Sequence, residues 1–118
     1  MKKILIIEDD NNLNKGLSIA LNKEYEIFSV NTIIEAKNFI DDADLILLDM
    51  NLPDGDGLEI IKYTRETSSM PIIVLSAIDL EAYIISAIKL SLKLFCIFIK
   101  TESVTVMRWL KNLNWKIL

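Results

Sequence analysis

Acidic side chains follow two separate apolar segments of the chain. Glu8 and Asp9 come directly after the apolar residues 4–7. Asp49 follows the apolar residues 45–48. If both segments are neighbouring strands of one parallel sheet, their carboxyl ends meet at the same edge, which is where open α/β sheets bind ligands. Like charges that close disfavour their own ionisation unless a cation lies among them. The pattern therefore predicts a cation site.

Each of these acids also has a plainer interpretation. An Asp that follows a strand often caps a turn or faces solvent, and Glu8 and Asp9 could equally be solvated loop acids. Two acidic strand ends in one small volume favour the cation site, because a purely structural role gives no reason for such a charge density.

The segments that must position the acids alternate between two patterns. Short apolar runs without period-two alternation indicate strands buried on both faces, and apolar residues at helical spacing follow each run. The strands are expected at residues 3–7, 26–30, 45–48, 71–76 and 94–99. The helices are expected at residues 11–22, from 32 to about 41, 57–65, 79–90 and 103–113. This alternation predicts an α/β fold with a parallel sheet, helices on both faces and right-handed crossovers.

Local signals mark where the first two helices begin. Asp10 or Asn11 can cap the first helix, because both side chains accept hydrogen bonds from orphan backbone N–H groups. Thr32 and Glu35 have the spacing of a capping box, in which Thr32 is the N-cap and Glu35 reaches back. These signals favour helices after the first and second strands.

The segment after Asp49 is rich in Pro, Gly and Asp and is expected to be a loop. Gly55 and Gly57 allow backbone conformations that are closed to other residues. Asp56 can cap the helix that follows. We assign these residues a structural role rather than a catalytic one.

Length and composition exclude several classes of protein. The 118 residues are one ordinary domain, and no apolar stretch reaches the ~20 residues of a membrane span. No signal peptide is recognisable, and a lone Cys96 suits a reducing compartment, so we expect a cytoplasmic domain. The net charge of −4 argues against nucleic-acid binding by this segment. The absence of His excludes imidazole catalysis and His-ligated metals.

In their order and spacing, residues 4–10, 47–57 and 71–77 resemble the receiver domain of bacterial two-component response regulators. The resemblance covers nearly the whole chain and is strongest to receivers joined to winged-helix DNA-binding domains. It implies a flavodoxin-like (βα)5 fold, doubly wound around a five-stranded parallel sheet. Residues 1–118 would then be a single receiver domain, with any output domain absent from this chain and DNA contacted only through that domain.

The resemblance also implies a chemistry. Asp49 would accept a phosphoryl group from a phosphohistidine of a sensor histidine kinase, without enzymatic activity beyond slow autodephosphorylation. A carboxylate can attack phosphorus in line when charge on the equatorial oxygens is neutralised, and Mg²⁺ prefers oxygen ligands. Asp9, Asp49 and the Asn51 backbone carbonyl would be direct Mg²⁺ ligands, and Glu8 a ligand through water.

The carboxyl-terminal third departs from the family pattern. Ser76 matches the switch hydroxyl that binds a phosphoryl oxygen, although a Ser can also simply end a strand. Counted without a gap from Ser76, the aromatic switch falls on Phe95 and the family lysine on Phe98. Lys100 comes two residues later. Either the connection carries two extra residues, so that Lys100 contacts the phosphate and Ile97 takes the aromatic position, or the lysine is missing and Lys100 faces solvent. The strand ending at Lys100 favours the first alternative.

Three functions are consistent with these residues. The first is a phospho-accepting receiver that switches an output such as transcription. The second is a pseudo-receiver, an interaction module that no longer switches, which the altered fifth strand favours. The third, a Mg²⁺-dependent phosphohydrolase, is disfavoured because such enzymes have a second Asp where this chain has Asn51. Apolar residues across 79–113 predict a homodimer through the last two helices and the strand between them, unless they only fill the core.

Overall fold

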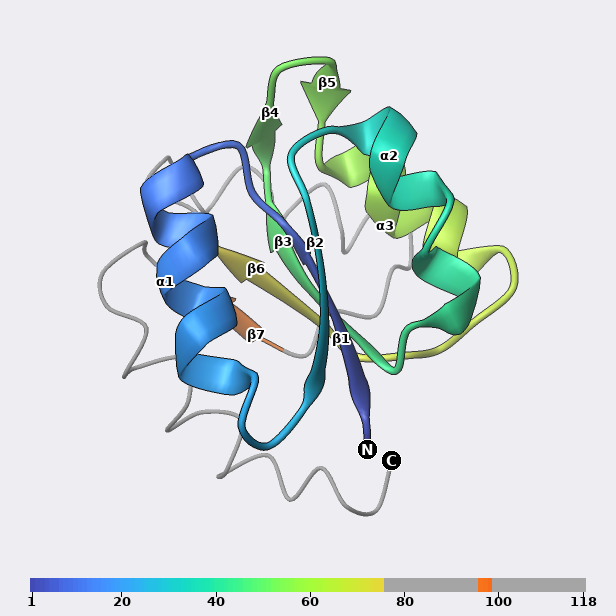
Figure 1. Ribbon diagram of the computed structural model, residues 1–118. Coiled ribbons are helices and arrows are strands. Elements are labelled where there is room, and N and C mark those ends of the chain that lie inside the picture. The colour runs from blue at the N-terminus through green and yellow to red at the C-terminus, as the bar shows by residue number, and fades with distance from the viewer. Residues whose placement is uncertain (76–95, 99–118) are drawn as a thin grey trace.

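The computed structural model describes residues 1–75 and, for the backbone alone, residues 96–98. Within this part of the chain the strands form a five-stranded sheet in the order β2-β1-β3-β6-β7, and every neighbouring pair is parallel (Figure 1). The strands are β1 (Lys3–Ile7), β2 (Glu26–Val30), β3 (Leu45–Asp49), β6 (Ile72–Leu75) and β7 (Cys96–Phe98). The predicted flavodoxin-like parallel sheet is confirmed. The helices predicted at 79–90 and 103–113, and with them the proposed dimer surface, lie outside the described residues.

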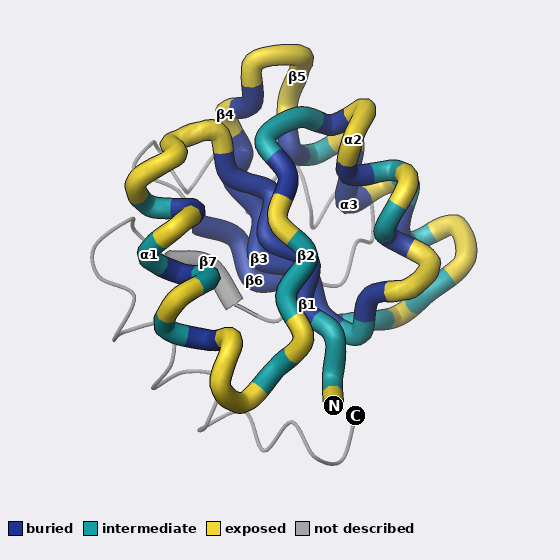
Figure 2. The backbone as a smooth tube through the Cα atoms, in the orientation of Figure 1, coloured by how far each residue is buried: buried dark blue, intermediate teal, exposed yellow. Residues whose placement is uncertain are grey.

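Helices cover both faces of the sheet. Helix α1 (Asn11–Leu21) lies on one face, and α2 (Ile33–Lys37) and α3 (Leu58–Arg65) lie on the other (Figure 1). Alternate residues of the central strands point to opposite faces, which makes two apolar cores. Figure 2 shows the central strands as buried along most of their length. The core under α1 includes Ile4, Ile6, Leu17, Leu21, Leu45 and Leu47. The core under α2 and α3 includes Leu5, Ile7, Ile46, Leu48, Ile60 and Ile61.

Most local predictions agree with the structure. The first two strands have the predicted bounds, and α1 ends at Leu21, one residue earlier than expected. Asp10 caps α1, since its Oδ1 accepts hydrogen bonds from the N–H groups of Asn12 and Leu13 at 3.0 and 3.1 Å. The Thr32 Oγ1 accepts from the Glu35 N–H at 3.2 Å, as the capping box predicts. The second helix therefore begins where the sequence indicates.

That second helix is shorter than predicted. α2 ends at Lys37, and the chain continues through a separate 3-10 turn, η1 (Ile40–Asp42). The Phe39 N–H donates to the Ala36 carbonyl at 2.9 Å, an i→i−3 bond that tightens the chain out of the α-helical path. The Phe39 ring stacks on Phe28 of β2 with 5.5 Å between ring centroids. The ring contact and the tighter turn replace the last turn of the expected helix.

The loop after Asp49 contains a small hairpin that the sequence did not predict. β4 (Asn51–Leu52) pairs antiparallel with β5 (Gly55–Asp56). Gly55 has a φ of +156°, so the backbone freedom predicted for this glycine is needed. Gly57 has a helical φ of −57°, so that explanation is wrong for it. Gly57 is required instead by a close approach to the backbone at Asp49.

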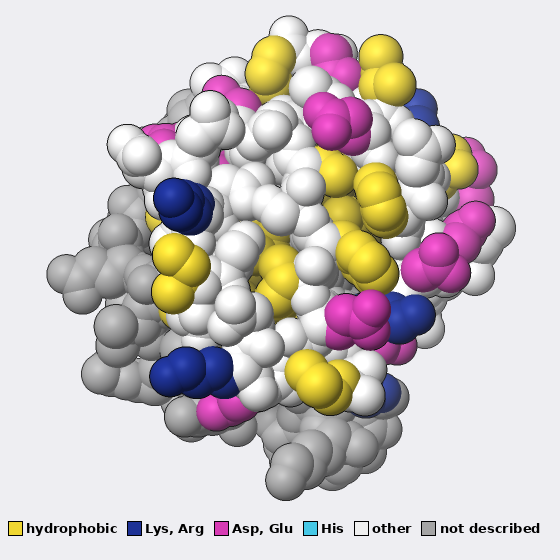
Figure 3. All heavy atoms as spheres, viewed as in Figure 1, with side chains coloured by type: hydrophobic (Ala, Val, Ile, Leu, Met, Phe, Trp, Pro, Cys, Tyr) yellow, Lys and Arg dark blue, Asp and Glu magenta, His cyan; other side chains and the backbone are white. Residues whose placement is uncertain are grey.

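Two further observations concern the helices and the surface of the described residues. None of the described helices is both long and apolar enough to cross a membrane. Among the described residues on the face shown in Figure 3, the Lys and Arg side chains lie apart from one another. Among these residues, this face shows no broad basic area.

Candidate phosphoryl-acceptor and metal site

The register of β1 and β3 brings the acidic side chains together. Ile7 pairs with Leu48, the residue before Asp49, so Glu8 leaves its strand beside Asp49. Ligand oxygens of Glu8, Asp9 and Asp49 all lie within 4.8 Å of one another. Glu8 is 0% exposed and Asp49 is 2% exposed, whereas Asp9 is exposed. We call these three residues the acidic cluster.

Backbone N–H groups orient the two buried carboxylates. The Asp10 N–H donates to Glu8 Oε2 at 3.1 Å, and the Asn51 N–H donates to Asp49 Oδ1 at 3.1 Å. The second oxygen of each carboxylate is buried as well. Asn51, predicted to offer its carbonyl, thus lies next to the acidic cluster at the start of β4. A compact set of carboxylate oxygens fits the coordination chemistry of Mg²⁺, which takes oxygen ligands and keeps several waters.

Two asparagines fix the backbone at the start of the acidic cluster. Asn14 of α1 is 5% exposed, and its Nδ2 donates to the carbonyls of Glu8 at 3.0 Å and Val30 at 3.1 Å. The Ser29 hydroxyl donates to Asn14 Oδ1. From the other side, Asn31 Nδ2 donates to the same Glu8 carbonyl at 2.9 Å. The peptide that carries Glu8 into Asp9 is therefore held from two elements.

Sequence reasoning missed both asparagines. Asn14 stands three residues before the buried Leu17 and seven before Leu21, so it is a polar residue on the apolar stripe of α1. A polar residue at such a position must find hydrogen-bond partners when it is buried. That signal was available in the sequence, whereas nothing in the sequence pointed to the Asn31 contact with Glu8.

The other predicted site residues, Ser76, Phe95 and Lys100, lie outside the described residues. The backbone of β7 bears on their alignment, because Phe98 pairs with Leu75, and Leu75 pairs with Asp49 on its other side. Phe98, the ungapped position of the family lysine, therefore lies in the row of the sheet that contains Asp49. The roles of Ser76, Phe95 and Lys100 stay predictions.

Comparison with known proteins identifies the family. Residues 4–100 match the response regulator receiver domain. The chain belongs to this family. The acidic cluster of this receiver domain is typical of the Mg²⁺ site of the family. Members of the family are typically non-enzymatic phosphoacceptors.

The similar curated proteins are transcriptional regulators. The receiver domain is 45% identical over 91 residues to the transcriptional regulatory protein KdpE of Staphylococcus aureus, covering 73% of this chain and 38% of that protein. It is 38% identical over 93 residues to the KDP operon transcriptional regulatory protein KdpE of Escherichia coli, covering 75% of this chain and 40% of that protein. The match thus spans about two fifths of the length of these relatives.

Solved structures agree on the fold. The BeF3-activated receiver domain of Klebsiella pneumoniae RstA superposes with a TM-score of 0.81 and 24% identity, covering 97% of this chain and 98% of that one. At that identity the likeness establishes the fold, and the site residues must be argued from this chain.

Proposed function

We propose that this receiver domain accepts a phosphoryl group on Asp49 from a sensor histidine kinase, with Mg²⁺ bound at the acidic cluster. The modification would switch an output, which is transcription when the receiver is joined to a DNA-binding domain, as the names of its relatives suggest. The observation that supports the proposal most directly is the buried Asp49 at the end of β3, with ligand oxygens of Glu8 and Asp9 within 4.8 Å.

Asp49 is the acid best placed to act as the nucleophile. The Asn51 N–H holds its Oδ1, which fixes the carboxylate at the carboxyl edge of the sheet. Asp54, a nearby alternative, uses both of its oxygens to accept hydrogen bonds from the N–H groups of Ile33 and Ile34 at 2.8 and 3.1 Å. An oxygen engaged in that way is a poor nucleophile, so we expect no phosphoryl group on Asp54.

The reaction is an exchange of one bond to phosphorus for another. A carboxylate oxygen of Asp49 attacks in line, its bond to phosphorus forms, and the bond from phosphorus to the donor imidazole nitrogen breaks. Mg²⁺, when bound, supplies positive charge for the phosphoryl oxygens. The carboxylates of Glu8 and Asp9 would hold the Mg²⁺ ion beside Asp49. Asn51 stands where a phosphohydrolase has an acid, so this position offers no general acid for rapid release of phosphate.

The test is the intact mass of the protein after incubation with a small acyl phosphate. With Mg²⁺ we expect the mass of a single added phosphoryl group, and with excess EDTA none. Failure to add the group in Mg²⁺ would contradict the proposal and favour the pseudo-receiver, with the altered fifth strand as the cause. Equal addition with and without Mg²⁺ would contradict the role of the acidic cluster.

Mg²⁺ is also expected to raise the melting temperature of the parent protein, and Asp9→Ala is expected to remove that rise. A ligand at a hundredfold excess over its Kd stabilises the native state by about 2.7 kcal/mol, which is several degrees for a domain of this size. Asp9 is exposed, so its truncation should cost the fold little. The measurement is thermal unfolding in Mg²⁺ and in EDTA.

Asp41→Ala is the matched control, because Asp41 is also an exposed acid but lies in η1, outside the acidic cluster. This variant loses the same charge and should keep the full Mg²⁺ effect. A parent protein that melts at one temperature in both buffers, or an Asp9→Ala variant with the parental rise, would count against the site.

A further inference from the structure

The two halves of the acidic cluster come from the ends of β1 and β3, beyond the last pair that these two strands form with each other. Glu8 and Asp9 follow β1, Asp49 ends β3, and the pairing of these two strands stops at Ile7 and Leu48. Beyond that pair, Glu8 is held by the bond from its N–H to the Val30 carbonyl at 3.1 Å and Asp49 by its pairing with Leu75, and the loops add further contacts between the two halves. The segment Asn31–Ile34, which runs from the end of β2 into the first turn of α2, contacts the loops on both sides.

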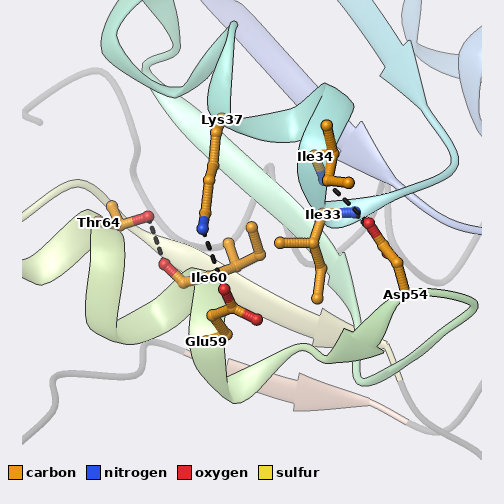
Figure 4. A network of polar contacts seen from close by, with 7 residues as sticks. All are labelled: Ile33, Ile34, Lys37, Asp54, Glu59, Ile60 and Thr64. Atoms are coloured by element: carbon orange, nitrogen blue, oxygen red, sulfur yellow. Dashed lines mark hydrogen bonds and ion pairs between the residues drawn. The ribbon is translucent and has the colours of Figure 1, made fainter.

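One of these contacts is made by Asp54 at the tip of the β4–β5 hairpin. Its Oδ1 accepts from the Ile33 N–H at 2.8 Å and its Oδ2 accepts from the Ile34 N–H at 3.1 Å (Figure 4). These N–H groups open α2 and have no partner within the helix. The bonds, the one from Ile33 foremost, favour the ionised carboxylate and lower the pKa of Asp54. The hairpin that follows Asp49 is thus fastened to α2.

Apolar packing fits the hairpin to the same place. The Ile33 side chain is 2% exposed, and its Cδ1 would lie 2.8 Å from a Cβ added to Gly55. The tip of the hairpin therefore approaches Ile33 as closely as a glycine allows. A shift of the hairpin away from α2 would break both the hydrogen bonds and this contact.

The second contact is made by Asn31, two residues before Ile33. Its Nδ2 donates to the Glu8 carbonyl at 2.9 Å and to Asn11 Oδ1 at 3.2 Å. The segment Asn31–Ile34 therefore binds the end of β1 through Asn31 and the hairpin beyond β3 through Asp54. Glu8 and Asp49 lie at the two ends of this connection.

We propose that Asp54 and Asn31 are positioning residues, which act through the segment Asn31–Ile34 as one brace that sets the spacing of the acidic cluster for Mg²⁺. The inference rests on the proposed function, since it concerns the metal site of that function. Neither side chain is assigned as a metal ligand. Residues that position metal ligands typically change metal affinity 10–100-fold when they are removed. We expect Asp54→Ala and Asn31→Ala each to raise the Kd for Mg²⁺ about tenfold.

The experiment measures the Kd for Mg²⁺ by calorimetry for the parent, both single variants and the double variant. If the brace acts as one unit, removing either end releases it, and the double variant should lose about the same tenfold as each single variant. Glu59→Ala is the control, because Glu59 binds α2 through Lys37 at 3.0 Å without joining the acidic cluster (Figure 4). Its Kd should stay within about twofold of the parental value.

The outcomes separate this inference from the proposed function. A parent protein that binds no Mg²⁺ would overturn both. If the parent binds Mg²⁺ and the variants bind it with the same Kd, the brace alone is overturned. The brace is also overturned if the Kd of the double variant rises by the product of the two single rises. Asp54 is exposed and Asn31 is half-buried, so both variants should fold. Far-UV circular dichroism checks this, and Asp54→Asn, which keeps one acceptor oxygen, should fall between the parent and Asp54→Ala.

Discussion

Asp49→Asn is expected to abolish phosphoryl uptake completely while the domain stays folded. The amide has the shape of the carboxylate but no nucleophilic oxygen of comparable strength. Its carbonyl oxygen can still accept the hydrogen bond from the Asn51 N–H that Asp49 accepts at 3.1 Å. One of the three carboxyl groups of the acidic cluster is also replaced by a neutral amide, which removes a source of repulsion among oxygens that lie within 4.8 Å of one another.

Two measurements check this expectation. Intact mass after incubation with the acyl phosphate and Mg²⁺ should show the added group in the parent and none in Asp49→Asn. Thermal unfolding in EDTA should give the variant a melting temperature close to or above that of the parent, and Mg²⁺ should raise it less. Phosphoryl uptake by the variant would mean that another acid is the acceptor. Asp9 would then be the first acid to substitute in a second variant.

Gly57→Ala is expected to lower the free energy of unfolding by about 1–3 kcal/mol and to weaken Mg²⁺ binding. A Cβ on Gly57 would lie 2.7 Å from the Asp49 carbonyl oxygen, 2.8 Å from the Met50 Cα and 2.9 Å from the Met50 Sδ. Met50 is only 2% exposed, so it has little room to move. The clash falls on the backbone of the acceptor itself, so relief of the strain must shift Asp49.

Urea unfolding measures the change, with Gly16→Ala as the control. Gly16 lies inside α1, and apart from its chain neighbours and the adjacent helix backbone no described atom comes within 4 Å of a Cβ added there. Alanine favours a helix over glycine by roughly 0.5–1 kcal/mol, so the two substitutions should change stability in opposite directions. A neutral Gly57→Ala variant with parental Mg²⁺ affinity would mean that α3 can begin farther from Asp49 than the structure places it.

The sequence predicted those parts of the fold that depend on local pattern. The strand bounds of β1 and β2 were correct, and in β1 the reason is the apolar run of a strand whose last four residues are all buried. The meeting of Glu8 and Asp49 followed from the rule that parallel strands end at one edge. The bounds of α2 were wrong, since the stacking of Phe39 on Phe28 of β2 is a tertiary contact that helical spacing does not show.

The contacts that shape the site were not predictable in the same way. Asp54 accepts from N–H groups 20 and 21 residues earlier in the chain, and Asn31 reaches back 23 residues to Glu8. Residue types show which groups can donate or accept, but the partner is set by how loops pack after the sheet has formed. The sequence therefore placed Asp54 in a loop but did not predict which N–H groups donate to its carboxylate.

The burial of β3 has a consequence for how the protein is made. All five residues of β3 are buried, and the strand lies between β1 and β6. Synthesis releases β3 well before residues 72–75 are available to pair with it. During that interval β3 presents an unpaired edge with apolar side chains on both faces, which is a template for pairing with other chains. A chain released before residue 72 is therefore expected to aggregate. In the complete chain, β6 pairs with this edge of β3 and so removes the template for aggregation.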